Sequence, residues 1–195
     1  MSYAIENLYP TPIYVSDVKQ FIEIQTEIKN FVDTLTFDTK ENWGETHYLS
    51  SQNFDDNFID NCKLPHFSDE LDFHLRNYCR EIEFPFRNYK IDSWVSLFKK
   101  GNYGHVHSHG HVDIAGVYYY KTNEIDGNLF FECPVPNIGS SFCYYNKYCK
   151  RWVHVPKEGK ILLFPGWIRH GITTNTTDNT RISISFNITF DRGII

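Results

Sequence analysis

The sequence predicts a mainly β protein: a double-stranded β-helix, or jelly roll, with N-terminal helices packed on one of its sheets. Three observations support this prediction. The chain from Tyr89 onward is a series of short apolar runs, turn-forming residues separate these runs, and aromatic residues make up 17% of the chain. Many short strands at close and even spacing are typical of an antiparallel sandwich or barrel. Aromatic residues are enriched in strands.

The predicted strands begin after Tyr89. They occupy residues 91–98, 114–120, 128–133, 141–145, 151–155, 160–164, 171–175 and 181–190. Clusters of Gly, Asn, Asp, Pro and Lys separate them, as expected for the turns of an antiparallel architecture. We therefore expect eight strands in two facing sheets.

Two helices are expected before the strands. Residues 16–35 place apolar side chains on one helical face, with Ser16 as the N-cap. Residues 68–83 repeat this pattern, with Leu71, Tyr78 and Ile82 facing inward, Ser68 as the cap and Pro85 beyond the end. Residues 36–67 show no clear pattern. The prediction is one domain over residues 1–195, largely helical over 1–88 and a double-stranded β-helix over 89–195.

Composition excludes several classes of protein. The net charge of -5 argues against a nucleic-acid-binding surface. No apolar run is long enough to span a membrane, and the N-terminus has no signal-peptide pattern. The five cysteines are odd in number and form no CxxC pair, which indicates reduced thiols and a cytoplasmic location. A homodimer is compatible with these features.

A row of histidines suggests a metal site. His105, His107, His109 and His111 occupy alternate positions, and Asp113 continues the series. Alternate residues of a strand share one face, about 6.5 Å apart, so only one adjacent pair could bind the same ion. The third ligand must come from elsewhere, and His170, which follows an apolar strand and a turn, is the candidate.

Arg181 follows His170 by eleven residues and opens a strand in which it shares a face with Ser183 and Asn187. A buried arginine beside a metal requires an anion, and its planar guanidinium can bind a carboxylate through two parallel hydrogen bonds. The far carboxylate of 2-oxoglutarate fits this need.

The chain resembles the Fe(II)/2-oxoglutarate oxygenase family of uncharacterised phage and marine bacterial proteins, which is prolyl-hydroxylase-like with a cupin-type double-stranded β-helix. The matching motifs are colinear: Leu8–Ile13, Trp94–Tyr103, His107–His109, Ala115–Tyr120, Gly127–Phe131, Leu163–Trp167 with His170, and Arg181–Asn187. The resemblance implies Fe(II) and 2-oxoglutarate as cofactors and molecular oxygen as co-substrate. It also implies hydroxylation of a C–H bond in an unidentified small molecule or peptide.

The family pattern places the second histidine of its pair seven residues before Gly116, which selects His107 and His109 as partners of His170. Two alternatives stay open at this point. Asp113 could join the site as a carboxylate, or His111 and Asp113 could form an H-x-D pair with His170. A site of three histidines departs from the usual two-histidine, one-carboxylate set and leaves the native metal open between iron, zinc and nickel.

The resemblance also assigns neighbours of the metal. Tyr119 is expected to hydrogen-bond 2-oxoglutarate, with core packing as its alternative role. Ser183 and Asn187, which share a face with Arg181, are expected to line the pocket and to contact 2-oxoglutarate. His47, His66 and His74 lack a partner pattern, which favours packing roles. Two other functions remain compatible with these residues: a cupin-like, metal-dependent dioxygenase or isomerase that does not use 2-oxoglutarate, and a non-catalytic metal-binding module.

Overall fold

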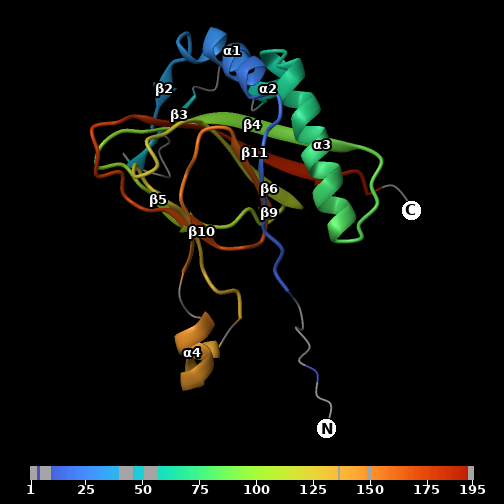
Figure 1. The fold of residues 1–195 in the computed structure, drawn as a ribbon, viewed down its shortest axis with the longest axis vertical. Helices are drawn as coiled ribbons and strands as arrows, with labels where there is room; N and C mark the ends of the chain where they lie inside the picture. Colours follow the sequence, from blue (N-terminus) through green and yellow to red (C-terminus); the bar gives the residue numbers. More distant parts are fainter. Residues whose placement is uncertain are drawn as a thin grey trace.

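The structure is a computed structural model that describes residue 4 and residues 10–39, 46–50, 57–135, 137–148 and 151–192 (Figure 1). Positions 8 and 9 of the Leu8–Ile13 motif, Cys149 and parts of the segment 36–67 lie outside the described residues. Within these residues, no helix is both long and apolar enough to cross a membrane.

Two antiparallel sheets face each other, which confirms the predicted jelly roll (Figure 1). The larger sheet contains, in spatial order, β1 (Tyr14–Asp17), β9 (Lys160–Pro165), β6 (Ile114–Lys121), β11 (Arg181–Phe190), β4 (Tyr89–Phe98), β3 (Tyr48–Ser50) and β2 (Phe37–Asp38). The smaller sheet contains β5 (Gly104–His107), β10 (His170–Ile172), β7 (Leu129–Phe131) and β8 (Trp152–His154). From β4 to β11 the chain passes repeatedly between the two sheets, as a double-stranded β-helix requires.

The two faces of the larger sheet have different partners. Val95, Tyr118 and Ile184 point outward and join the hydrophobic cluster that includes the helices. Val117 and Phe164 point inward and pack with residues of the smaller sheet. Because strand side chains alternate, each strand of the larger sheet contributes to both layers. The inward face is therefore the one that can form a site.

Helices α1 (Phe21–Val32), α2 (Phe58–Asn61) and α3 (Pro65–Glu81) cover the outer face of the larger sheet (Figure 1). The two predicted long helices exist, but both predicted caps are wrong. Ser16 lies in β1, because the chain still pairs with β9 there. Ser68 lies inside α3, which begins at Pro65, a residue whose missing N–H has no helical partner to lose.

Glu70 of α3 caps α1 across the helix pair. Its Oε1 atom accepts hydrogen bonds from the backbone N–H groups of Lys19 and Gln20, both at 3.0 Å. Its Oε2 atom lies 3.0 Å from Nε2 of the buried His74. The two hydrogen bonds to Oε1 explain how α1 begins without a capping side chain of its own.

Replacing Glu70 with alanine should lower the free energy of unfolding by about 3 kcal/mol, because several buried polar groups lose their partner. Urea denaturation measures the change. Asp72→Ala is the control, since Asp72 of the same helix forms a surface ion pair with Arg76, and such pairs contribute about 1 kcal/mol or less. Equal losses in the two variants would contradict the capping role.

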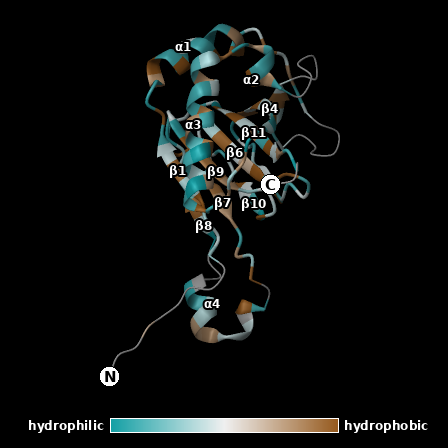
Figure 2. Cartoon of the chain, turned by 90° about the vertical axis from the view of Figure 1, so that its right-hand side faces the viewer, coloured by the Kyte–Doolittle hydropathy of each residue, from teal (hydrophilic) through white to brown (hydrophobic). Residues whose placement is uncertain are grey.

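The predicted strand 141–145 is wrong, since Phe142–Tyr148 forms helix α4. In the sequence α4 lies between β7 and β8, and Figure 2 shows it projecting away from the two sheets. The Ser141 carbonyl accepts a hydrogen bond from the Tyr145 N–H at 2.8 Å, and the Asn146 amide donates to the Phe142 carbonyl at 2.9 Å. Away from the sheets these local bonds replace strand pairing.

Candidate metal centre

Three histidines converge between the sheets. His107 ends β5 and lies opposite His170 of β10 in the antiparallel register, while His109 follows in the loop after β5. The Nε2 atoms of His107 and His109 are 3.1 Å apart. One nitrogen from each of the three rings lies within 4.8 Å of the other two. This spacing matches the ligand shell of a single transition metal ion, whose bonds to imidazole are about 2.1 Å long.

Each of these rings is oriented by a hydrogen bond at its other nitrogen. Nδ1 of His107 donates to the His105 carbonyl at 2.8 Å, and Nδ1 of His170 donates to the Ile168 carbonyl at 2.9 Å. Nδ1 of His109 donates to Oδ1 of Asn187 at 2.6 Å. Such partners fix the tautomer, so the Nε2 lone pairs remain available for a metal.

Burial keeps the three imidazoles neutral. It lowers the pKa of His107, that of His109 to about 4 and that of His170 to about 3, and repulsion from neighbouring histidines is a smaller contribution. A neutral imidazole is the form that binds metals, so these rings are ready to act as ligands near neutral pH.

The metal-free protein should therefore lose stability in acid. Below pH 6.5, the unfolded chain takes up protons at His109 and His170 while the folded chain does not. Between pH 6.5 and about 4, the free energy of unfolding should fall by up to about 1.4 kcal/mol per pH unit for each group. Urea denaturation at several pH values measures the slope. A His109→Gln/His170→Gln variant with an unchanged slope would refute this assignment.

Asn187→Leu should weaken metal binding by about 10- to 100-fold, because the His109 ring loses the partner that orients it. Isothermal titration with Mn(II) gives the dissociation constant. Ser183→Ala is the control, because Ser183 lies on the same face of β11 and lines the same cavity. The prediction fails if both variants bind Mn(II) as the wild type does.

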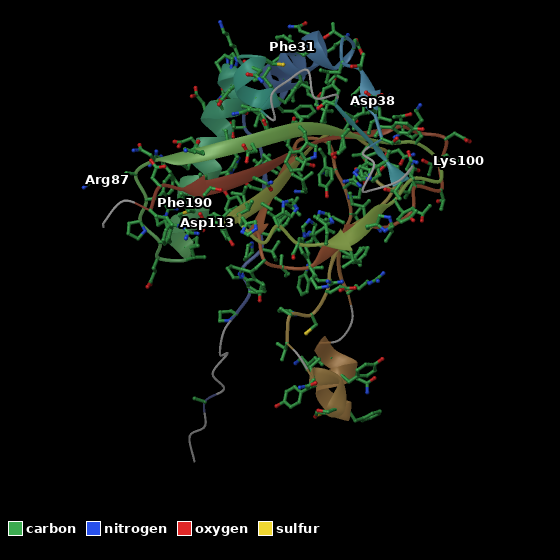
Figure 3. All side chains as sticks on the ribbon, turned by 180° about the vertical axis from the view of Figure 1, so that it is seen from behind. Phe31, Asp38, Arg87, Lys100, Asp113 and Phe190 are labelled. Atoms are coloured by element: carbon green, nitrogen blue, oxygen red, sulfur yellow. The ribbon has the colours of Figure 1, made fainter. Side chains whose placement is uncertain are left out.

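The remaining members of the histidine row lie elsewhere. Residues 110–113 form a turn, in which the Val112 N–H donates to the His109 carbonyl at 3.0 Å. His111 is exposed in this turn. Oδ2 of Asp113 accepts a hydrogen bond from the Phe190 N–H at 2.8 Å, and the two residues lie side by side in Figure 3. Neither His111 nor Asp113 belongs to the group of converging ligand atoms.

A cavity of about 520 Å³ opens beside the three histidines, within the size range of small-molecule sites. The inward faces of β4 and β11 provide much of its wall. Its polar and aromatic lining includes Trp94, Ser96, Arg181, Ser183, Ser185 and Asn187. The histidine cluster and Arg181 therefore open into the same cavity.

Arg181 is fully buried and lines this cavity. Its Nη1 atom donates to the Gly127 carbonyl at 3.1 Å, and its guanidinium lies 5.1 Å from the Phe98 ring centre and 5.0 Å from that of Tyr119. Its Nε atom has no hydrogen-bond partner, and neither does the buried Tyr119 hydroxyl. Among the described residues, no carboxylate forms an ion pair with Arg181. Two buried donors without partners mark a place for an anion.

Two cavity residues were not predicted from the sequence. His47 is buried, stacks on Phe98 with ring centres 4.9 Å apart and lines the cavity, although only a packing role was expected. Trp94 stacks on His109 with ring centres 6.4 Å apart. The alternation of β4, which places Trp94 on the same face as Phe98, is the signal that could have identified Trp94.

Solved structures with the same fold include three from different organisms. A Pseudomonas putida prolyl-4-hydroxylase has a TM-score of 0.65 at 11% identity, covering 95% of this chain and 96% of its own. A Trichoplax adhaerens prolyl hydroxylase, in complex with a hypoxia inducible factor peptide fragment, has a TM-score of 0.63 at 14% identity, with coverages of 92% and 83%. HygX from Streptomyces hygroscopicus, with nickel and 2-oxoglutarate bound, has a TM-score of 0.64 at 11% identity, with coverages of 93% and 84%.

No curated protein sequence matches the chain. Residues 92–187 match the sequence model of the family described as "Putative 2OG-Fe(II) oxygenase". The matched segment extends from β4 into β11 and contains the three converging histidines, Tyr119 and Arg181. Over this segment, the chain is similar to the 2OG-Fe(II) oxygenase family.

Proposed function

We propose that the protein is an Fe(II)- and 2-oxoglutarate-dependent oxygenase that hydroxylates a C–H bond of a small-molecule or peptide substrate. His107, His109 and His170 would hold the iron, and Arg181 would bind the far carboxylate of 2-oxoglutarate. One observation carries the proposal: a fully buried arginine with an unpaired Nε atom lines the same cavity as three converging imidazoles.

The donor set fits a divalent transition metal. Three neutral imidazoles suit iron, zinc and nickel, and they leave one more positive charge than a set with one carboxylate. A dianionic 2-oxoglutarate would offset that charge. When bound, Fe(II) and 2-oxoglutarate would supply the oxidising chemistry, in which the C–H substrate, oxygen and 2-oxoglutarate yield the hydroxylated product, succinate and carbon dioxide.

The residues of the chain would bind and orient 2-oxoglutarate and would exclude water from the site. The guanidinium of Arg181 offers parallel N–H groups to a carboxylate, and the nearby Tyr119 hydroxyl can donate a further hydrogen bond. Ser183 lines the same cavity as Arg181. Asn187 was expected to contact 2-oxoglutarate, but its Oδ1 atom accepts from His109, so we assign it to orienting that ligand. Apolar neighbours such as Phe164 and Ile172 line the rest of the wall and limit water.

Several assignments from the sequence remain predictions. These are the single domain over residues 1–195, the cytoplasmic location, the homodimer and the absence of a nucleic-acid partner.

Turnover of labelled 2-oxoglutarate tests the proposal. Anaerobically purified protein loaded with Fe(II) should form labelled succinate once oxygen is admitted, even without its substrate, and Zn(II)-loaded protein should not. A 2-oxoglutarate-dependent rise in melting temperature of the Mn(II)-loaded protein provides a second readout. Metal binding without either effect would contradict the proposal and favour a cupin-like enzyme that does not use 2-oxoglutarate, or a non-catalytic module.

A further inference from the structure

We infer that Asp126 is the positioning residue of the 2-oxoglutarate anchor, in that it fixes the orientation of Arg181 without contacting the ligand. The inference rests on the proposed function of Arg181. Asp126 lies in the loop between β6 and β7, is fully buried and is absent from the lining of the cavity.

Both carboxylate oxygens of Asp126 are held by hydrogen bonds. Oδ1 accepts from the Thr122 hydroxyl at 2.6 Å. Oδ2 accepts from the Asn123 N–H at 2.9 Å and from the Asn179 side-chain amide at 2.6 Å. The Asn179 bond connects this loop to the segment that leads into β11, two residues before Arg181.

The backbone connects Asp126 to Arg181 through the residue that follows Asp126. The next residue, Gly127, accepts the hydrogen bond from Nη1 of Arg181 through its carbonyl. Gly127 has a φ of +110°, and a Cβ atom there would lie 2.7 Å from the Thr173 carbonyl oxygen. Only glycine fits this position, so the direction of its carbonyl is set by the loop that Asp126 holds.

The Phe98 residue, whose ring lies beside Arg181, is also connected to these loops by hydrogen bonds. The Asn175 side-chain amide donates to the carbonyls of Phe98 and Asn179, at 3.1 and 2.7 Å. The Phe98 ring lies over the guanidinium. The carbonyl and the ring that define the plane of Arg181 are therefore both connected to Asn179, and through it to Asp126.

This arrangement matters for anion binding because a two-bond contact with a carboxylate depends on the orientation of the guanidinium plane. Asp126→Asn would place an amide where the carboxylate now accepts three donors. Either the Thr122 hydroxyl reverses its hydrogen bond to accept, or an N–H donor faces the new amide donor. In both cases the charge-assisted bonds are lost, so the loop that carries Gly127 would shift. Asn179→Ala removes one of these bonds without changing any charge, so it separates positioning from electrostatics.

The test measures ligand affinity in the Mn(II)-loaded protein under anaerobic conditions. Asp126→Asn should raise the dissociation constant of 2-oxoglutarate about tenfold, and Asn179→Ala should raise it to a smaller extent. The dissociation constant of Mn(II) itself should not change. Both variants should also discriminate less between 2-oxoglutarate and the shorter oxaloacetate or the longer 2-oxoadipate. Loss of global stability alone would not alter this ratio.

Asp178→Asn is the matched control and should leave every value unchanged, because Asp178 is an exposed neighbour of Asn179 in the loop before β11 and pairs with Lys100. Tighter 2-oxoglutarate binding by Asp126→Asn would make Asp126 a counter-charge and overturn the inference, as would unchanged affinity and selectivity in Asn179→Ala. Wild-type protein that binds Mn(II) but not 2-oxoglutarate would overturn the proposed function as well.

Discussion

Replacing His170 with alanine is expected to weaken metal binding by at least about 100-fold, more than the loss of an orienting partner costs, and to abolish succinate formation. His170 is the most buried of the three converging histidines, and its ring lies within 5.1 Å of both others, measured between ring centres. Two remaining imidazoles would leave the ion bound largely by water. Isothermal titration with Mn(II) and labelled 2-oxoglutarate turnover measure the two effects.

The neighbouring histidines provide the controls. His105→Ala and His111→Ala change exposed side chains of the same row, so both variants should bind Mn(II) as the wild type does. His107→Ala and His109→Ala should behave like His170→Ala. A loss of metal in His111→Ala with retention in His107→Ala would instead support the H-x-D pair of His111 and Asp113.

The sequence predicted the jelly roll and the meeting of His107 with His170 because both depend on regular patterns. Strand alternation and turn residues determine which faces meet, and the order of strands in a double-stranded β-helix then brings β5 next to β10. The choice of His107 over His111 needed a further step, the family spacing to Gly116. Strand geometry alone allowed any adjacent pair.

The contacts that orient the site could not be predicted in this way. The hydrogen bond from His109 to Asn187 joins residues 78 positions apart. The stacking of His47 on Phe98 has the same long-range character. Neither contact leaves a local spacing in the sequence. The strand predicted at residues 141–145 is wrong for a related reason: its aromatic residues have strand propensity, but no strand among the described residues pairs with them.

Arg181→Met should separate stability from ligand binding. Without 2-oxoglutarate, the variant should melt at the same temperature as the wild type or higher, because a buried cation with an unpaired Nε atom is replaced by an apolar side chain of similar length. Its dissociation constant for 2-oxoglutarate should rise by about 100-fold, since two charge-assisted hydrogen bonds are lost.

Two further variants show whether charge or the planar pair of donors causes the loss of 2-oxoglutarate binding. Arg181→Lys keeps the charge but not the planar pair of donors, so its affinity for 2-oxoglutarate should lie between those of the wild type and Arg181→Met. Arg169→Met removes an exposed arginine that pairs with Glu132 and should leave 2-oxoglutarate binding unchanged. If Arg181→Met lowers the melting temperature and leaves 2-oxoglutarate affinity intact, the buried arginine serves the fold, and an enzyme that does not use 2-oxoglutarate becomes the better account. A gain in stability with a loss of binding would instead show that the fold tolerates an unfavourable buried charge because the ligand requires it.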